Sequence, residues 1–185
     1  MDQKLFLWLN SFHAESLNSF MIFLSGQALW LPFIIWFIYL GVKKEDRNKA
    51  YIFIFFLGLL LICSDVTSSY LFKNIFTRMR PCRLEELKPF IYDFGQKCGG
   101  KFGFISSHAS NSFALVTFSV LSLRKHMKMG WIYFILPIMV SFSRIYLGVH
   151  YPGDIVVGAL NGIAFGYIFY FLLGQTYGAT RKTSH

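Results

Sequence analysis

Residues 50–72 read AYIFIFFLGLLLICSDVTSSYLF, and this stretch decides the class of fold. It is apolar except for a short polar segment near its end, and its single charged residue is Asp65. A helix needs about 20 mostly apolar residues to cross the hydrocarbon core of a bilayer. The stretch therefore predicts a membrane-spanning helix.

Four further stretches have the length and apolar character of a membrane span, namely residues 16–42, 102–123, 129–149 and 155–180. We therefore predict an all-α integral membrane protein, a single membrane-embedded domain over residues 1–185 with about five transmembrane helices. Residues 5–12 are too short to span, and we expect them to form an interfacial helix rather than a signal peptide. Gly26, Gln27 and Pro32 leave open whether residues 16–42 form one helix or two.

The overall composition excludes other classes of protein. Hydrophobic residues make up 55% of the chain and charged residues 15%, whereas soluble domains carry about 25% charged residues. Such a composition fits neither a disordered chain nor a small soluble domain. The net charge of +9 could suggest nucleic acid, but the basic residues lie between apolar runs, so we expect no nucleic-acid partner.

Alternating spans place the connections on two faces of the membrane. The connections after the second and fourth spans share one face with the N-terminus; the other two connections share the opposite face with the C-terminus. Each face carries nine Lys and Arg residues, and six remain on the first face once three cations are assigned to chemistry below. The positive-inside rule then favours a cytoplasmic C-terminus and an extracytoplasmic loop at residues 73–101, in a multi-pass protein of the inner (plasma) membrane.

Two cysteines in this loop bear on its side of the membrane. Cys82 and Cys98 are sixteen positions apart, and they form either a disulfide or two free thiols. A disulfide persists only in an oxidising compartment, so a bridge here supports an extracytoplasmic loop.

Three polar clusters lie at span ends on this same face. They are Lys73 with Arg80 and Pro81, then Ser106, Ser107 and His108, and finally Ser143, Arg144, His150 and Asp154. Any one of these residues could be a simple membrane anchor. Their convergence on one face instead indicates a site of chemistry.

The residue types fit phosphoryl transfer, because a transferring phosphoryl group spreads negative charge over three oxygens. Lys73, Arg80 and Arg144 would surround these oxygens. Ser106 and Ser107 open a helix whose free N–H groups suit an anion. With three cations and no cluster of carboxylates, we expect no metal and no cofactor.

The histidines and the aspartate supply the remaining groups. His150 would attack phosphorus, giving a phosphohistidine, and Asp154 would orient its ring and stabilise the cation that forms. His108 would protonate the leaving oxygen and then accept a proton from water.

The three clusters resemble the signature of the type 2 phosphatidic acid phosphatase superfamily, which is Lys-x6-Arg-Pro, Pro-Ser-Gly-His and Ser-Arg-x5-His-x3-Asp. The first and third motifs match fully, while Ile105 and Ser107 replace the Pro and Gly of the second. The resemblance implies a helical bundle of the acid-phosphatase and haloperoxidase type, metal-independent hydrolysis, and the residue roles given above.

Several polar residues lie outside these motifs. Asp65 and Asn161 are expected to make hydrogen bonds between helices, with a role in supporting the site as the alternative. Arg78 and Arg83 are interpreted as solvated loop charges, with contacts to a second phosphate or a sugar as the alternative.

The resemblance implies a lipid phosphatase that acts on a membrane lipid within the bilayer. Lipid A 1-phosphate and undecaprenyl diphosphate are favoured as substrates, while phosphatidylglycerol phosphate and phosphatidic acid stay possible. A lipid-to-lipid phosphotransferase and a non-catalytic lipid-binding or flipping protein are the alternatives. The sequence leaves the oligomeric state open.

Overall fold

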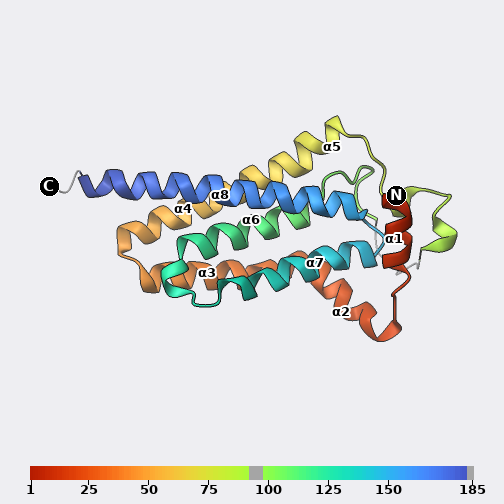
Figure 1. Ribbon diagram of the computed structural model, residues 1–185, viewed down its shortest axis with the longest axis horizontal. Coiled ribbons are helices and arrows are strands. Elements are labelled where there is room, and N and C mark those ends of the chain that lie inside the picture. Colours follow the sequence, from red (N-terminus) through yellow and green to blue (C-terminus); the bar gives the residue numbers. More distant parts are fainter. Residues whose placement is uncertain (92–97, 183–185) are drawn as a thin grey trace.

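The computed structural model describes residues 1–91 and 98–182, and over these residues the fold is helical. The longer elements are α1 (Asp2–Asn10), α2 (Glu15–Ser25), α3 (Trp30–Lys44), α4 (Arg47–Val66), α6 (Ser107–Ser122), α7 (Ile135–Tyr146) and α8 (Pro152–Lys182). The short ones are η1 (Gln27–Leu29), η2 (Thr67–Leu71), α5 (Phe72–Ile75), η3 (Pro81–Arg83), η4 (Lys88–Phe90), η5 (Arg124–His126) and η6 (Gly130–Phe134). Figure 1 shows α3, α4, α6, α7 and α8 running along the long axis, with α1 lying across one end.

The structure contains helices long and apolar enough to cross a membrane. Within the described residues these are Arg47–Ile75 and Pro152–Ala179, and a third if the bent pair α2 and α3 is one span. The chain is therefore an integral membrane protein, but the count of exactly five spans is not reached by helix length. The predicted span at 129–149 is a helix of residues 130–146, shorter than a full crossing.

The predicted span at residues 102–123 begins later than expected. Helix α6 starts at Ser107, because the residues before it pair with the segment that follows α5. Gly103 N–H donates to the Arg78 carbonyl at 2.9 Å, and Arg80 N–H donates to the Lys101 carbonyl at 3.4 Å. The backbone before Ser107 thus belongs to the loop rather than to the helix. Its hydrogen bonds bring the segment that carries Arg80 close to the start of α6.

The first predicted span is divided into two helices. Residues 16–42 form two helices, α2 and α3, which are bent by 51° at the break between them. The predicted interfacial helix is α1, and it docks on the bundle: Phe6 is fully buried against the Tyr151 ring. The Asn10 side chain donates to the carbonyls of Ile145 and Tyr146, which end α7.

Helices α6 and α8 pack closely, and glycines make this close approach possible. Gly158, Gly162 and Gly166 recur every fourth residue on the face of α8 that meets α6. A Cβ atom at Gly162 would lie 2.2 Å from the Ser110 carbonyl oxygen, and one at Gly158 would lie 2.7 Å from that of Ser106. Small residues at such spacing let helix backbones approach within a membrane.

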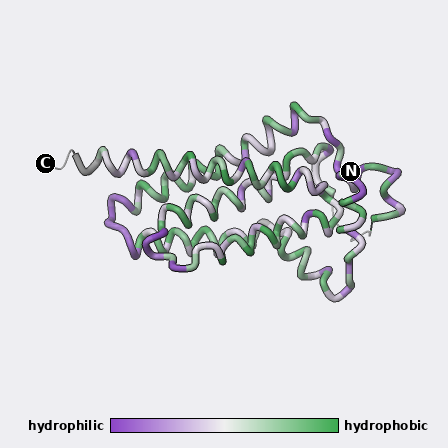
Figure 2. The backbone as a smooth tube through the Cα atoms, viewed as in Figure 1, coloured by the Kyte–Doolittle hydropathy of each residue, from purple (hydrophilic) through white to green (hydrophobic). Residues whose placement is uncertain are grey.

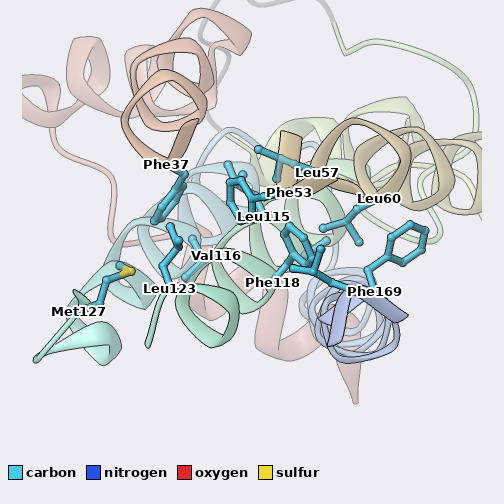
Figure 3. Close-up of a cluster of buried hydrophobic side chains, with 12 residues drawn as sticks. Phe37, Phe53, Leu57, Leu60, Leu115, Val116, Phe118, Leu123, Met127 and Phe169 are labelled. Carbon is cyan, nitrogen blue, oxygen red and sulfur yellow. The ribbon is translucent and has the colours of Figure 1, made fainter. Parts of the chain in front are cut away.

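The apolar core lies mainly away from the polar clusters. Figure 3 shows side chains of α3, α4, α6 and α8 meeting there, among them Phe37, Phe53, Leu57, Phe118 and Phe169. Figure 2 shows apolar residues along the bundle and hydrophilic ones at the connection between α3 and α4. The core thus fixes the helices at one end and leaves the other end for polar groups.

The glycine contact predicts that a methyl group at position 162 destabilises the fold. Gly162→Ala should lower the free energy of unfolding by about 1–3 kcal/mol, because the added atom meets backbone and the backbone cannot yield cheaply. Thermal unfolding in detergent measures this. Gly174→Ala is the matched control on the same helix, since a Cβ there meets nothing within 4 Å and should be neutral or slightly stabilising. Equal midpoints for the two variants would contradict the prediction.

Candidate active site

The three predicted clusters meet at one end of the bundle. They come from the end of α5, the start of α6 and the turn between α7 and α8. A cavity of about 680 Å3 opens there. Its polar lining includes Lys73, Arg80, Ser107, His108, Arg144 and His150.

His150 and Asp154 lie side by side although a turn separates them. His150 Nδ1 is 3.5 Å from Asp154 Oδ2, and both side chains are almost fully buried. The opposite ring atom, His150 Nε2, is 3.4 Å from an Arg80 guanidinium nitrogen. One ring nitrogen thus faces the carboxylate and the other faces a cation that lines the cavity.

The three cations are held by polar side chains and backbone. Lys73 Nζ donates to Ser107 Oγ at 2.8 Å, and Arg80 Nε donates to the Phe102 carbonyl at 3.2 Å. The Arg144 guanidinium hydrogen-bonds Ser25 Oγ, at the end of α2. The hydroxyl that replaces the motif glycine at position 107 therefore contacts a cation of the site.

Ser106 has a different place from the one expected for a phosphate ligand. Its side chain accepts from Ala109 N–H at 3.4 Å and caps α6, and it is fully buried rather than lining the cavity. Its own N–H donates to the Asp154 carbonyl at 3.1 Å, which ties the start of α6 to the start of α8. The hydroxyl oxygen thus satisfies a free N–H of the first turn of α6, as an N-cap residue does.

Asp65 and Asn161 occupy different positions relative to the cavity. Asp65 is exposed and lines it, and its Oδ1 accepts from Asn111 at 2.9 Å and from Ser69 at 3.3 Å. Asn161 donates to Ser110 Oγ at 2.8 Å and so joins α8 to α6.

The loop cysteines and Arg83 make contacts within the loop and with the turn after α7. A disulfide joins Cys82 and Cys98, whose Cα atoms are 6.0 Å apart, and Cys82 N–H donates to the Gly148 carbonyl at 3.1 Å. Arg83 donates to the Gly99 carbonyl at 2.6 Å. The predicted loop at 73–101 includes residues 92–97, which lie outside the described residues.

The interpretation of Arg78 as a solvated charge was wrong, since it bridges Asp154 and Asp2. The spacing from Arg80 is a sequence signal that points toward such a role. In an extended segment residues i and i+2 lie on the same face, so this spacing places Arg78 on the same face as Arg80. Asp2 and Ser25 carried no signal, since nothing in the sequence relates them to residues more than 70 positions away.

Burial and nearby like charges lower the pKa values of His150 and Arg80. Burial, together with the charges of Arg80 and Arg144, holds the pKa of His150 well below its usual range. Burial likewise lowers the pKa of Arg80. Both effects disfavour additional positive charge, so the site accommodates an anion better than a further cation.

Most of the charged side chains that line the cavity are cations. Within residues 1–91 and 98–182, no three His, Cys, Asp or Glu side chains are placed to hold a metal ion. What the cavity does offer is two arginines and a lysine, which match the charge and shape of a phosphate group.

A sequence model of the PAP2 superfamily matches residues 50–176, which include all three clusters. The chain belongs to the PAP2 superfamily. The resemblance inferred from the three motifs is confirmed, and with it the prediction of a phosphatase.

Curated PAP2 relatives align over most of the chain. It is 31% identical to a lipid A 4'-phosphatase of Bacteroides thetaiotaomicron over 176 residues, covering 93% of this chain and 76% of the relative. It is 32% identical to the lipid A 4'-phosphatase of Porphyromonas gingivalis, covering 92% and 72%. An undecaprenyl-diphosphatase of Sulfolobus acidocaldarius is 28% identical, with coverage of 86% and 72%.

A solved structure shares the fold. The crystal structure of Aquifex aeolicus LpxE superposes with a TM-score of 0.59 at 21% identity, covering 90% of this chain and 93% of that one. At this identity the likeness shows the fold alone, which is that of a membrane phosphatase bundle of the PAP2 type.

The low pKa of His150 predicts activity that persists in acid. For His150 as the predicted nucleophile, the neutral ring is the reactive form, and a lowered pKa moves its loss to lower pH, so the acid limb of kcat/KM should lie below pH about 6.5. Arg80→Met should move this limb toward higher pH, because the Arg80 charge helps to lower the pKa. Arg83→Met is the control and should leave the limb in place, since Arg83 does not line the cavity.

The same substrate must serve all three proteins, because its phosphate also titrates. Titration of the substrate then contributes equally to each pH profile. The difference between the variants therefore reflects titration of a group on the enzyme. A limb that stays at the same pH in Arg80→Met would contradict the electrostatic account of His150.

Proposed function

We propose that this PAP2 protein is a membrane lipid phosphatase that works through a phosphohistidine intermediate. The observation that carries the proposal is a single cavity with two unlike ends. One end gathers two histidines and three cations, and the other is walled by apolar side chains of α3, α4 and α6, which are Trp30, Ile34, Leu61, Ile62, Val66 and Leu115. A lipid phosphate needs both kinds of surface at once.

The proposed reaction has two steps. His150 Nε2 forms a bond to phosphorus as the bond to the lipid oxygen breaks, and His108 donates the proton that this oxygen takes up. A water then attacks the phosphohistidine, gives a proton to His108, and releases inorganic phosphate with the His150 ring restored. Asp154, 3.5 Å from Nδ1, stabilises the positive ring of the intermediate.

Lys73, Arg80 and Arg144 would bind the oxygens of the transferring group. Within residues 1–91 and 98–182, the hydrogen-bond partners of these cations are neutral groups, namely hydroxyls, a carbonyl and the His150 ring. A phosphate would add negative charge next to these three cations, which stabilises both substrate and transition state.

We propose a phosphorylated glycolipid of the lipid A class as substrate. Two relatives named lipid A 4'-phosphatases support this class, and they favour the 4'-phosphate over the 1-phosphate that the sequence suggested. The cavity also supports it, because Asp65, Ser69 and Asn111 line it beside the cations. These groups can hydrogen-bond sugar hydroxyls, which a polyprenyl diphosphate lacks near its phosphates.

Undecaprenyl diphosphate is the second candidate. Similarity to an undecaprenyl-diphosphatase supports it, and so does the apolar part of the cavity wall. A lipid-to-lipid phosphotransferase would differ only in the second step, where a lipid acceptor replaces water.

We also propose that the site end faces the extracytoplasmic side of the plasma membrane, with the C-terminus in the cytoplasm. The disulfide between Cys82 and Cys98 supports this side, since it adjoins the site. Lys43, Lys44, Arg47 and Lys49 lie at the opposite end, around the connection between α3 and α4.

Release of phosphate by purified protein tests the proposed reaction. In detergent with EDTA present, the wild-type chain should release phosphate fastest from lipid A and more slowly from undecaprenyl diphosphate, phosphatidylglycerol phosphate and phosphatidic acid. His150→Ala should lose at least about 10³-fold in rate, because the nucleophile is removed. His126→Ala is the control, since His126 pairs with Glu45 away from the cavity.

The products distinguish the alternatives. A doubly phosphorylated lipid without free phosphate would indicate a phosphotransferase. Lipid binding without any phosphate release, unchanged in His150→Ala, would overturn the proposal in favour of a lipid-binding or flipping protein.

A further inference from the structure

Arg78 connects two carboxylates at the end of the bundle. Its Nη1 is 2.9 Å from Asp154 Oδ1, and its Nη2 is 2.6 Å from Asp2 Oδ2. The guanidinium also stacks on the Tyr151 ring, 4.0 Å from the ring centroid. Both ends of its fork are thus engaged by acids, and Arg78 does not line the cavity. These contacts make a role in binding the phosphate a poor explanation for Arg78.

Asp2 is also bound to the helix that carries Asp154. Its second oxygen, Oδ1, accepts from Gly153 N–H at 2.9 Å, in the first turn of α8. The approach is close, because a Cβ atom at position 153 would lie 2.8 Å from Asp2 Oδ2. A carboxylate at a helix N-terminus is stabilised by the free N–H groups and the helix dipole. Helix α1 therefore supplies an anchor that holds Arg78 and α8 together.

The two oxygens of Asp154 have separate partners as a result. Oδ1 receives Arg78, while Oδ2 accepts from Tyr151 N–H at 3.0 Å and faces His150 Nδ1 at 3.5 Å. Rotation of the carboxylate would break both hydrogen bonds. A fully buried carboxylate is also costly without a cation, and Arg78 offsets that cost.

We propose that Asp2 and Arg78 are positioning residues, which hold the Asp154 carboxylate in the orientation that His150 needs. The proposal rests on the proposed function, because it assigns His150 as the nucleophile. It extends the site to α1, a helix that holds none of the three motifs. Neither residue lines the cavity, so their loss should affect the rate of the chemical step and leave binding of lipid unchanged.

Steady-state kinetics of variants test the two positioning residues. Arg78→Met should lower kcat about tenfold or more, and Asp2→Asn somewhat less, both with KM unchanged. Arg78→Lys should recover only part of the loss, because a single ammonium cannot bridge both carboxylates as a fork does. In the double variant, Asp2→Asn should add little to Arg78→Met, since the two residues act through one contact.

A variant without any change of charge provides a second test. Gly153→Ala places a methyl group against the Asp2 carboxylate, which can swing away cheaply, and alanine suits a helix. The midpoint of thermal unfolding should therefore stay equal or rise while kcat falls as in Asp2→Asn. This combination separates positioning from a general loss of stability.

The chain offers a matched control pair in the same loop. Lys88 and Glu85 form an exposed ion pair at 2.6 Å, and neither is among the residues that line the cavity. Lys88→Met and Glu85→Gln should leave kcat and KM unchanged.

The outcomes separate this inference from the proposed function. A wild-type protein that releases no phosphate from any lipid overturns the proposed function. An active wild type whose Arg78→Met and Asp2→Asn variants keep the wild-type kcat overturns the positioning role. It is also overturned if Gly153→Ala keeps both the wild-type unfolding midpoint and the wild-type kcat, since the Asp2 contact is then not needed for the chemical step.

Discussion

The site depends on the close approach of α6 and α8. Gly158, Gly162 and Gly166 remove the side chains that would keep these helices apart, and the backbones meet instead. The start of α6 carries His108, and the start of α8 carries Asp154 and adjoins His150. Ser106 N–H reaches the Asp154 carbonyl because the two helix ends are this close. The relation between the proposed acid and the proposed nucleophile is therefore set by backbone packing, which is harder to perturb than contacts between long side chains.

Charge is arranged around this rigid pair in two layers. Toward the cavity lie Lys73, Arg80 and Arg144, whose contacts are to neutral groups. Behind His150 lies Asp154, which is paired with Arg78 rather than with a cation of the cavity. Asp154 thus has its own counter-ion, so the cavity cations stay available to an anionic ligand. Arg78 neutralises Asp154, while Lys73, Arg80 and Arg144 line the cavity.

The sequence predicted the membrane class, the end of the bundle at which the clusters meet and most of the polar residues that line the cavity. These followed from hydropathy and from local motifs, which depend on residues near one another in the chain. Length alone could not show that α6 starts at Ser107, because pairing of residues 78–80 with 101–103 ends the preceding loop. Ser106 was predicted as a phosphate ligand, and the N-cap bond that its oxygen accepts from Ala109 N–H could not be read from the motif alone. Asp2 and Ser25 reach the site only through the tertiary fold, and no periodicity of the chain records such contacts.

The apolar part of the cavity bears on how a reaction there would be measured. Helices α3 and α4 touch where Gly41 meets Phe53, and Figure 1 shows them diverging toward the other end. Trp30 and Ile34 of α3 and Leu61 and Ile62 of α4 then border the cavity. A ligand entering between these helices arrives from within the bilayer plane. The variable that governs occupancy is then its mole fraction among lipids, and diluting a substrate with inert detergent or phospholipid lowers the rate even when its amount per volume is constant.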